Sequence, residues 1–282
     1  MVLPLHLYGK AARINFMSLG NYLVQLVSKF LMKQRPARKS YLSDYQQICD
    51  EIRLGDVILV EGRSYASHMV QRLTCSAWSH AALYIGRLQD IEDYELKALV
   101  RSFCQESFMH EHLVIESYLG RGTIVSPLRA YKDDHVRICR PAGISRQDIQ
   151  RVIRYVAENL GGGYNLRQFL DLGRFLVGGR LIPRNWNSIL FREDRGKATQ
   201  EVCSSLIAKA FTSVHFPILP QIREDHPHHY QLIHRNPKLF TPSDFDYSPY
   251  FNIIKYPIFI LSEKAPYYSE LPWDDSGKIS NQ

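Results

Sequence analysis

The order of its short apolar runs is what most constrains the fold of this chain. Five such runs come first, each rich in β-branched or aromatic residues and each ending at glycine or at polar residues: 55–62, 78–86, 112–117, 123–128 and 135–140. Runs of this length and composition predict β-strands. One helix, over 91–105, is predicted as an insertion between the second and third strands. The other helical patterns follow the strands, which favours an α+β fold over a doubly wound parallel sheet.

The clearest helix covers 145–160. Ser145 is placed to cap its start, apolar residues recur at helical spacing along it, and Gly161 ends it. Further helices are predicted over 166–177 and from about residue 200 to residue 214. These elements complete an α+β arrangement in which helices pack on a sheet.

The net charge is concentrated at the start of the chain. Residues 1–40 hold seven of the 35 Lys and Arg residues and none of the 28 Asp and Glu residues, so the remainder is formally neutral. A nucleic-acid-binding body would carry its basic excess on the folded surface, so we expect no nucleic-acid partner. No apolar run reaches the roughly 18 residues that a membrane-spanning helix needs. We therefore divide the chain into an arm (1–40), a body (41–265) and a tail (266–282).

The arm combines an apolar helical stripe, LGNYLVQLVSKFLM (19–32), with the basic cluster KQRPARK (33–39). This combination is typical of a segment that lies on an anionic membrane surface. A helix packed on the body, followed by a solvated linker, is the alternative. A secretory signal is less well supported, because no small-residue cleavage site follows the apolar run. The expected location is cytoplasmic and peripheral to a membrane, with export left open.

The five cysteines are widely spaced, and no two form a C-x-x-C pair. This pattern favours a reducing compartment over a disulfide framework or a zinc site. The histidine-rich stretch DHPHHYQLIH (225–234) offers metal-binding side chains, but Pro227 interrupts it and it lacks a distant partner motif, so we predict a polar loop. No metal or other cofactor is expected.

Three residues carry matching chemistry. Cys203 lies near the start of the predicted helix, where Thr199 is a suitable cap and the helix dipole favours a thiolate. His80 begins a strand in which His80, Ala82 and Tyr84 share a face, and a histidine there could act as a general base. Glu116 ends the apolar part of the next strand and could orient the imidazole. Taken singly, a core cysteine, a strand-edge histidine and a solvated acid are the more ordinary interpretations.

The motifs GDVILVEG, WSHAALYIG, VIES, GGGYN, CSSLIAKAF and TPSDFDYSPYF, in this order, resemble the YiiX/YaeF-like group of circularly permuted NlpC/P60 papain-like proteins. The resemblance covers about residues 50–260. It implies a permuted papain-like fold with an antiparallel sheet or half-barrel packed on helices. It also implies that Cys203 is the nucleophile, His80 the base and Glu116 the polar partner of the histidine.

The same resemblance places Tyr164 in the substrate cleft, and Trp78, Ser79 and Ser204 are further substrate-binding candidates. The chain departs from the group at Val202 and Ser205, where an aromatic and an acidic residue are common, and at Asn165, where aspartate is common. These departures fall at positions expected to contact the substrate or to form the oxyanion hole, and they leave the pairing of Cys203 with His80 unaffected.

The expected activity is that of a thiol hydrolase that cleaves a peptide, isopeptide or ester bond through an acyl-enzyme. Two alternatives remain. One is acyl transfer or hydrolysis on a lipid at a membrane surface, which the basic arm favours. The other is an inactive papain-like module that binds a partner, which the departures at Val202 and Ser205 favour.

Overall fold

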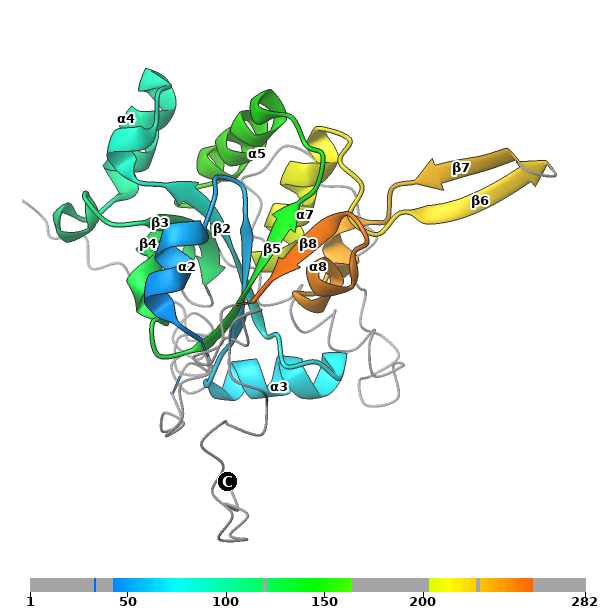
Figure 1. Ribbon diagram of the computed structural model, residues 1–282, viewed down its shortest axis with the longest axis horizontal. Coiled ribbons are helices and arrows are strands. Elements are labelled where there is room, and N and C mark those ends of the chain that lie inside the picture. Colours follow the sequence, from blue (N-terminus) through cyan, green and yellow to red (C-terminus); the bar gives the residue numbers. More distant parts are fainter. Residues whose placement is uncertain (1–32, 34–42, 119–120, 164–202, 227–228, 256–282) are drawn as a thin grey trace, which may run out of the picture.

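A six-stranded antiparallel sheet forms the centre of the protein (Figure 1). The computed structural model describes residues 33, 43–118, 121–163, 203–226 and 229–255. The sheet has the strand order β4-β3-β2-β1-β5-β8. Its strands are β1 (Val57–Glu61), β2 (His80–Gly86), β3 (Leu113–Tyr118), β4 (Gly122–Pro127), β5 (His135–Pro141) and β8 (Phe251–Ile254). All five strands predicted from the sequence are present, and β8 adds one edge.

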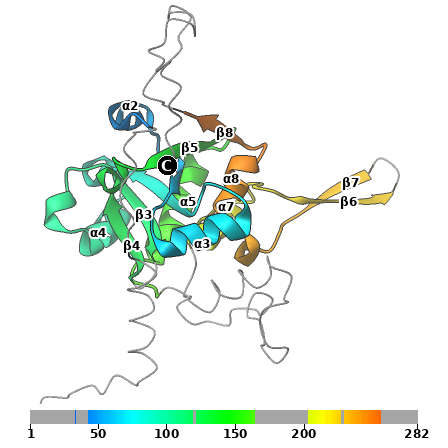
Figure 2. The same cartoon turned by 90° about the horizontal axis from the view of Figure 1, so that it is seen from below.

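Helices cover both faces of this sheet (Figures 1 and 2). Helices α5 (Arg146–Glu158) and α7 (Cys203–Ser213) pack on one face beside α4 (Tyr94–Phe103), whereas α2 (Tyr45–Glu51) packs on the other. This arrangement confirms the α+β class.

Because β2 lies between two layers, its side chains alternate between two cores. Ala81 and Leu83 pack in the core that contains α5 and α7, and Ala82 and Tyr84 pack in the core that contains α2. The predicted alternation along this strand is therefore confirmed. His80 shares the face of Ala82 and Tyr84, at the end of the strand.

The predicted helices that fall in the described residues are confirmed. In α5, the Ser145 hydroxyl accepts the Asp148 N–H at 3.0 Å, and the apolar stripe is buried against the sheet. The helix predicted over 91–105 is α4, whose start is capped by Asp93. Helix α7 is described from Cys203 onward. Thr199, the helix predicted over 166–177, the arm (apart from Lys33) and the tail lie outside the described residues.

Other elements connect these layers. They are α3 (Tyr65–Thr74), η1 (Leu88–Asp90), η2 (Glu106–Phe108), η3 (Leu128–Tyr131), η4 (Pro237–Leu239) and α8 (Ser243–Tyr247). Of these, η3 matters most for the candidate site, because it carries Tyr131 between β4 and β5. None of the described helices has both the length and the apolarity that crossing a membrane requires.

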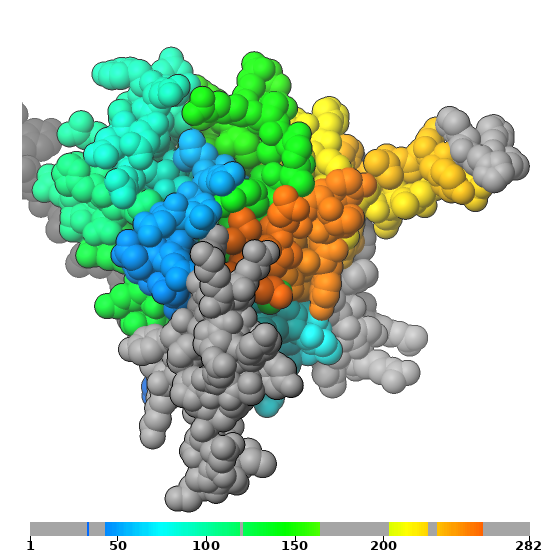
Figure 3. All heavy atoms as spheres, viewed as in Figure 1, coloured from blue at the N-terminus to red at the C-terminus, as the bar shows by residue number. Residues whose placement is uncertain are grey.

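The prediction of a loop at 225–234 was wrong. Strands β6 (Gln221–His226) and β7 (His229–Ile233) form a hairpin that extends away from the body (Figures 1 and 3). Ile222 is paired with Leu232, and Glu224 with Tyr230. Ile222, Tyr230 and Leu232 thus share one hairpin face, a strand period that the histidines and Pro227 obscured in the sequence.

Candidate active site

The candidate site lies where strands β2 and β3 part. Their pairing runs from Gly86↔Leu113 to Leu83↔Ile115, and within the described sheet no β3 partner is assigned to the residues 80–82. Cys203, the first described residue of α7, reaches this opening. Its sulfur accepts a hydrogen bond from the backbone N–H of Ala81. The opening therefore brings the start of a helix against the start of a strand.

Cys203 is buried and surrounded by donors. Besides the Ala81 N–H, its sulfur accepts the backbone N–H of Ser204 and is hydrogen-bonded to the His80 side chain. Burial opposes ionisation of the thiol, but the charge of His80 and these hydrogen bonds outweigh it and lower the pKa of Cys203 below the ordinary thiol value. These contacts therefore favour the thiolate form of the sulfur.

His80 lies between the sulfur and a carboxylate. Its Nε2 donates to Glu116 Oε2 at 2.5 Å, which leaves Nδ1 for Cys203. Its side chain is 15% exposed. Burial disfavours the imidazolium, but the charge and hydrogen bond of Cys203 and those of Glu116 raise the pKa of His80 to about 10. Tyr118 packs its ring edge-on against the imidazole, with centroids 6.1 Å apart.

Glu116 is held by more than the histidine. The same Oε2 atom also accepts the hydroxyl of Tyr131, from η3, and the Ser126 hydroxyl of β4 donates to the carboxylate as well. Burial raises the pKa of Glu116, but the hydrogen bond and charge of His80, followed by the Ser126 and Tyr131 donors, bring it below the ordinary value. Glu116 is therefore an ionised, buried carboxylate.

The structure brings the three predicted catalytic residues together. At neutral pH, the lowered pKa of Cys203 and the raised pKa of His80 favour a thiolate–imidazolium pair, with Glu116 as the second anion. Such a pair can attack a carbonyl carbon and then supply a proton to the leaving group.

The predicted substrate-binding residues are mostly engaged elsewhere. Trp78 is buried, and its Nε1 donates to Asp246 at 3.0 Å. The Ser79 hydroxyl accepts the N–H of Gly62, and the Ser204 hydroxyl donates to the carbonyl oxygen of Phe240 at 2.6 Å. These three side chains support the walls of the site. Tyr164 lies outside the described residues.

Sequence reasoning missed Tyr131 and Ser126. Neither belongs to a recognisable motif, since Tyr131 lies in a short 3-10 turn and Ser126 looks like an ordinary strand residue. A strand register would have placed Ser126 opposite Val114, two residues before Glu116, on the same face of the sheet. No comparable signal was available for Tyr131.

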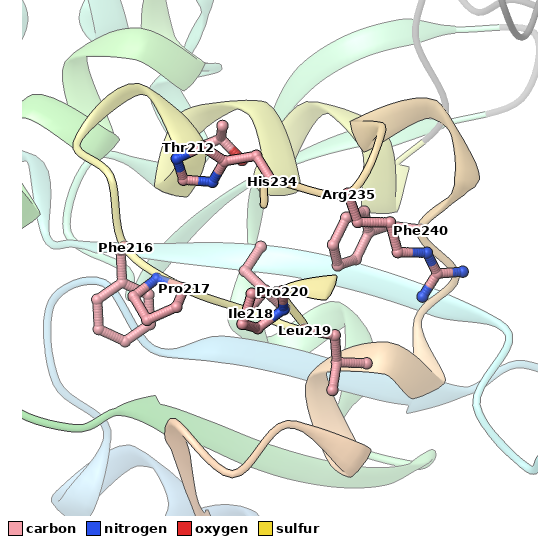
Figure 4. A pocket seen from close by; sticks show the side chains of 9 residues that line it. All are labelled: Thr212, Phe216, Pro217, Ile218, Leu219, Pro220, His234, Arg235 and Phe240. Carbon is pink, nitrogen blue, oxygen red and sulfur yellow. The ribbon is translucent and has the colours of Figure 1, made fainter. Parts of the chain in front are cut away.

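A small pocket lies apart from this site, against the C-terminal half of α7 (Figure 4). Thr212 lines it, nine positions after Cys203 and so about 13 Å farther along the helix axis. Its basic residue Arg235 is paired with Asp244 at 2.9 Å. The pocket therefore lies away from Cys203, and its arginine is already paired.

Comparisons with known proteins agree with the fold. Residues 51–171 match the family of permuted papain-like amidase enzymes, YaeF/YiiX, C92 family. This match confirms the resemblance to the YiiX/YaeF group and the permuted papain-like fold, and it supports an enzyme of the papain-like hydrolase kind. The matched range contains His80 and Glu116 and ends before Cys203. No curated protein matches the chain.

Among the solved structures similar to this chain is one of low identity. It is titled "Crystal structure of metalloprotein yiiX from Escherichia coli O157:H7", with 13% identity and a TM-score of 0.44, and the match covers 72% of this chain and 97% of that one. Its title describes that protein as a metalloprotein. Among the described residues of our chain, no group of three or more His, Cys, Asp or Glu side chains is placed to hold a metal.

Proposed function

We propose, on the match of residues 51–171 to the permuted papain-like amidases, that this protein is a cysteine amidase with Cys203 as nucleophile. The observation that carries the proposal is the chain of contacts Cys203–His80–Glu116, in which a buried sulfur, an imidazole and a carboxylate are hydrogen-bonded in sequence. The substrate is an amide of the peptide or isopeptide kind.

The reaction follows from the charges of the pair. The Cys203 thiolate attacks the carbonyl carbon and forms a C–S bond, and the electron pair of the C=O bond moves to oxygen. Backbone N–H groups at the start of α7 stabilise this oxyanion. His80 then gives its proton to the amide nitrogen as the C–N bond breaks, which leaves a thioester and a free amine.

Water completes the cycle. His80, now neutral, takes a proton from water while the oxygen attacks the thioester carbonyl. The C–S bond breaks, the carboxylic acid leaves, and the thiolate–imidazolium pair is restored. Glu116 stays ionised throughout and keeps the imidazole oriented toward the sulfur.

The test compares cysteine variants on a panel of fluorogenic acyl- and peptidyl-amides. Cys203→Ala is expected to abolish both turnover and iodoacetamide labelling of the tryptic peptide 198–209, which contains no other cysteine. Cys104→Ser is the matched control, because that half-buried thiol lies after α4 and touches no catalytic group. Full turnover by a folded Cys203→Ala protein would refute the proposal.

A second candidate substrate is an acyl group on a lipid, with transfer or hydrolysis at a membrane surface. The seven cations of residues 1–40 favour it, because they attract the chain to anionic lipid. Turnover of acyl lipids in anionic vesicles, measured beside turnover of soluble peptide amides, separates the two substrates.

The contact between Cys203 and His80 counts against an inactive binding module, because a partner-binding role requires no activated sulfur. A Cys203 thiol that titrates at the ordinary value would favour the module instead. The pH dependence of Cys203 alkylation distinguishes the enzyme from the binding module, and it needs no substrate.

A further inference from the structure

One oxygen atom of Glu116 accepts two donors. His80 Nε2 donates to Oε2 at 2.5 Å, and the Tyr131 hydroxyl donates to the same atom. Tyr131 has no contact of this kind with His80 itself; the two rings lie tilted, with centroids 6.2 Å apart. The tyrosine therefore acts on the histidine through the carboxylate.

We propose that Tyr131 is a positioning residue that acts on His80 through Glu116: its hydroxyl takes a share of the negative charge of the carboxylate, so that His80 can release its proton to the leaving group. A carboxylate that already accepts a second hydrogen bond is a weaker base toward the first donor. An imidazolium held too tightly is a poor general acid, because proton transfer is most effective when the acid can also give its proton up.

The surroundings of the pair support this role. The titratable and charged groups that face His80 come from three elements: Cys203 of α7, Glu116 and Tyr118 of β3, and Tyr131 of η3. Arg121 and Asp134 lie farther out, near Tyr118. The Cys203 thiolate and the Glu116 carboxylate both raise the proton affinity of His80. The hydroxyls of Tyr131 and Ser126, which donate to Glu116, act in the opposite direction and lower it.

The inference rests on the proposed function, but its test does not need a substrate. The rate of iodoacetamide alkylation at Cys203 is measured against pH by mass spectrometry of peptide 198–209 in the full-length protein. Two steps are expected in wild type: a lower one where the thiolate–imidazolium pair forms and an upper one where His80 loses its proton. The interval between the steps is the pH range in which the pair exists.

Tyr131→Phe should widen that interval. Without the phenol donor, Glu116 becomes a stronger base toward the imidazolium, so the lower step moves to lower pH and the upper step to higher pH, each by about half a unit, or about threefold in proton affinity. A hydroxyl that merely packs the site would have the opposite effect, because a loosened contact between His80 and Glu116 narrows the interval. An unchanged or narrowed interval overturns the proposal.

Three further variants make the result specific. Ser126→Ala removes the other donor and should widen the interval in the same direction, which covers the case in which Tyr131→Phe fails to fold. In a Glu116→Gln background, Tyr131→Phe should shift neither step, because no charge remains to be shared; an undiminished shift would overturn the proposal. Tyr84→Phe removes a buried hydroxyl that bonds His112, on the same sheet but away from the site, and should leave both steps in place.

Failure of this inference and failure of the proposed function give different results. If Cys203→Ala still cleaves amides, the enzyme mechanism is wrong, whatever the alkylation profiles show. If Cys203→Ala is inactive and Tyr131→Phe keeps the wild-type interval, only the role of Tyr131 is wrong.

Discussion

At the scale of single residues, the reactivity of the site depends on the charges that Cys203 and His80 hold together. Each stabilises the ionised form of the other inside a buried environment, and Glu116 adds to the stabilisation of the imidazolium. Removing either partner would therefore disfavour the ionised form of the other. The chemistry is therefore a property of the pair.

The pH dependence of amide turnover should be bell-shaped. The thiol of Cys203 has a lowered pKa, so activity rises with pH through a value below the ordinary thiol range as the thiolate forms. His80 has its pKa raised to about 10, so activity falls again as pH passes that value and the imidazolium is lost. Initial rates from pH 5 to 11 at substrate concentrations well below KM, which report the free protein, test this, and a single rise that follows an unperturbed thiol would contradict it.

Glu116→Gln should narrow that bell. The neutral amide no longer stabilises the imidazolium, so the alkaline limb moves to lower pH and the acid limb to higher pH, with about tenfold slower turnover at the optimum. Glu61→Gln is the matched control, because this acid bonds a different histidine, His135, at 3.0 Å. Equal effects of both changes would show that Glu116 acts only through the general charge of the protein.

At the scale of elements, the site depends on how β4 supports β3. The backbone of Thr123 in β4 exchanges hydrogen bonds with the turn after α5: its N–H donates to the Gly162 carbonyl at 2.8 Å, and its carbonyl accepts the Gly161 N–H at 3.0 Å. The Thr123 hydroxyl also bonds Ser117, next to Glu116. The turn at 161–163 therefore supports the strand that carries the carboxylate.

Gly122→Ala should destabilise the fold strongly. Gly122 has a φ of +75°, and a Cβ there would collide with the Gly162 carbonyl oxygen, so we expect a loss of roughly 3 kcal/mol in the free energy of unfolding. Gly143 has a similar φ of +72° and open space around it, so Gly143→Ala should cost only about 1 kcal/mol. Urea denaturation measures both, and equal losses would show that the close approach at Gly122 does not matter.

At the scale of the whole molecule, charge is segregated along the chain. The excess of cations lies in residues 1–40, and the remainder is formally neutral. A short basic segment beside a neutral body attracts the protein to an anionic surface without attracting nucleic acid to the body. We therefore propose an anionic membrane as the partner of residues 1–40.

Neutralising the basic cluster of the arm should release the protein from vesicles. At about 1 kcal/mol per cation, replacing Lys33, Arg35, Arg38 and Lys39 by glutamine lowers the partition coefficient on phosphatidylglycerol vesicles by roughly 1,000-fold at low salt. The matched control replaces four exposed arginines of the body, Arg72, Arg101, Arg146 and Arg151, and should have a much smaller effect. Vesicle sedimentation measures both partition coefficients. Equal losses of binding would show that the total charge of the protein, and not the basic cluster of the arm, determines the attraction.

The sequence by itself determined the secondary structure of the body and the candidate residues of the site. Short apolar runs and helical periodicity depend on local burial, so they predicted five strands, α4, α5 and the alternation of β2. The sequence also indicated Cys203 at the start of a helix, where backbone N–H groups gather. The prediction was wrong at the histidine-rich stretch 225–234, where a loop was expected and a hairpin is found. Few apolar residues mark the strand period of that hairpin.

Only the tertiary structure decided that these residues meet. The distance between Cys203 and His80 is set by strands β2 and β3 parting where α7 begins, and no local pattern encodes that gap. The same holds for Ser126, which reaches Glu116 through the pairing of β4 with β3, and for Tyr131, which reaches it through the turn after β4. It also holds for Trp78, Ser79 and Ser204, whose polar groups bond the scaffold. Local sequence specifies which face of an element is buried, whereas packing specifies which buried faces come together.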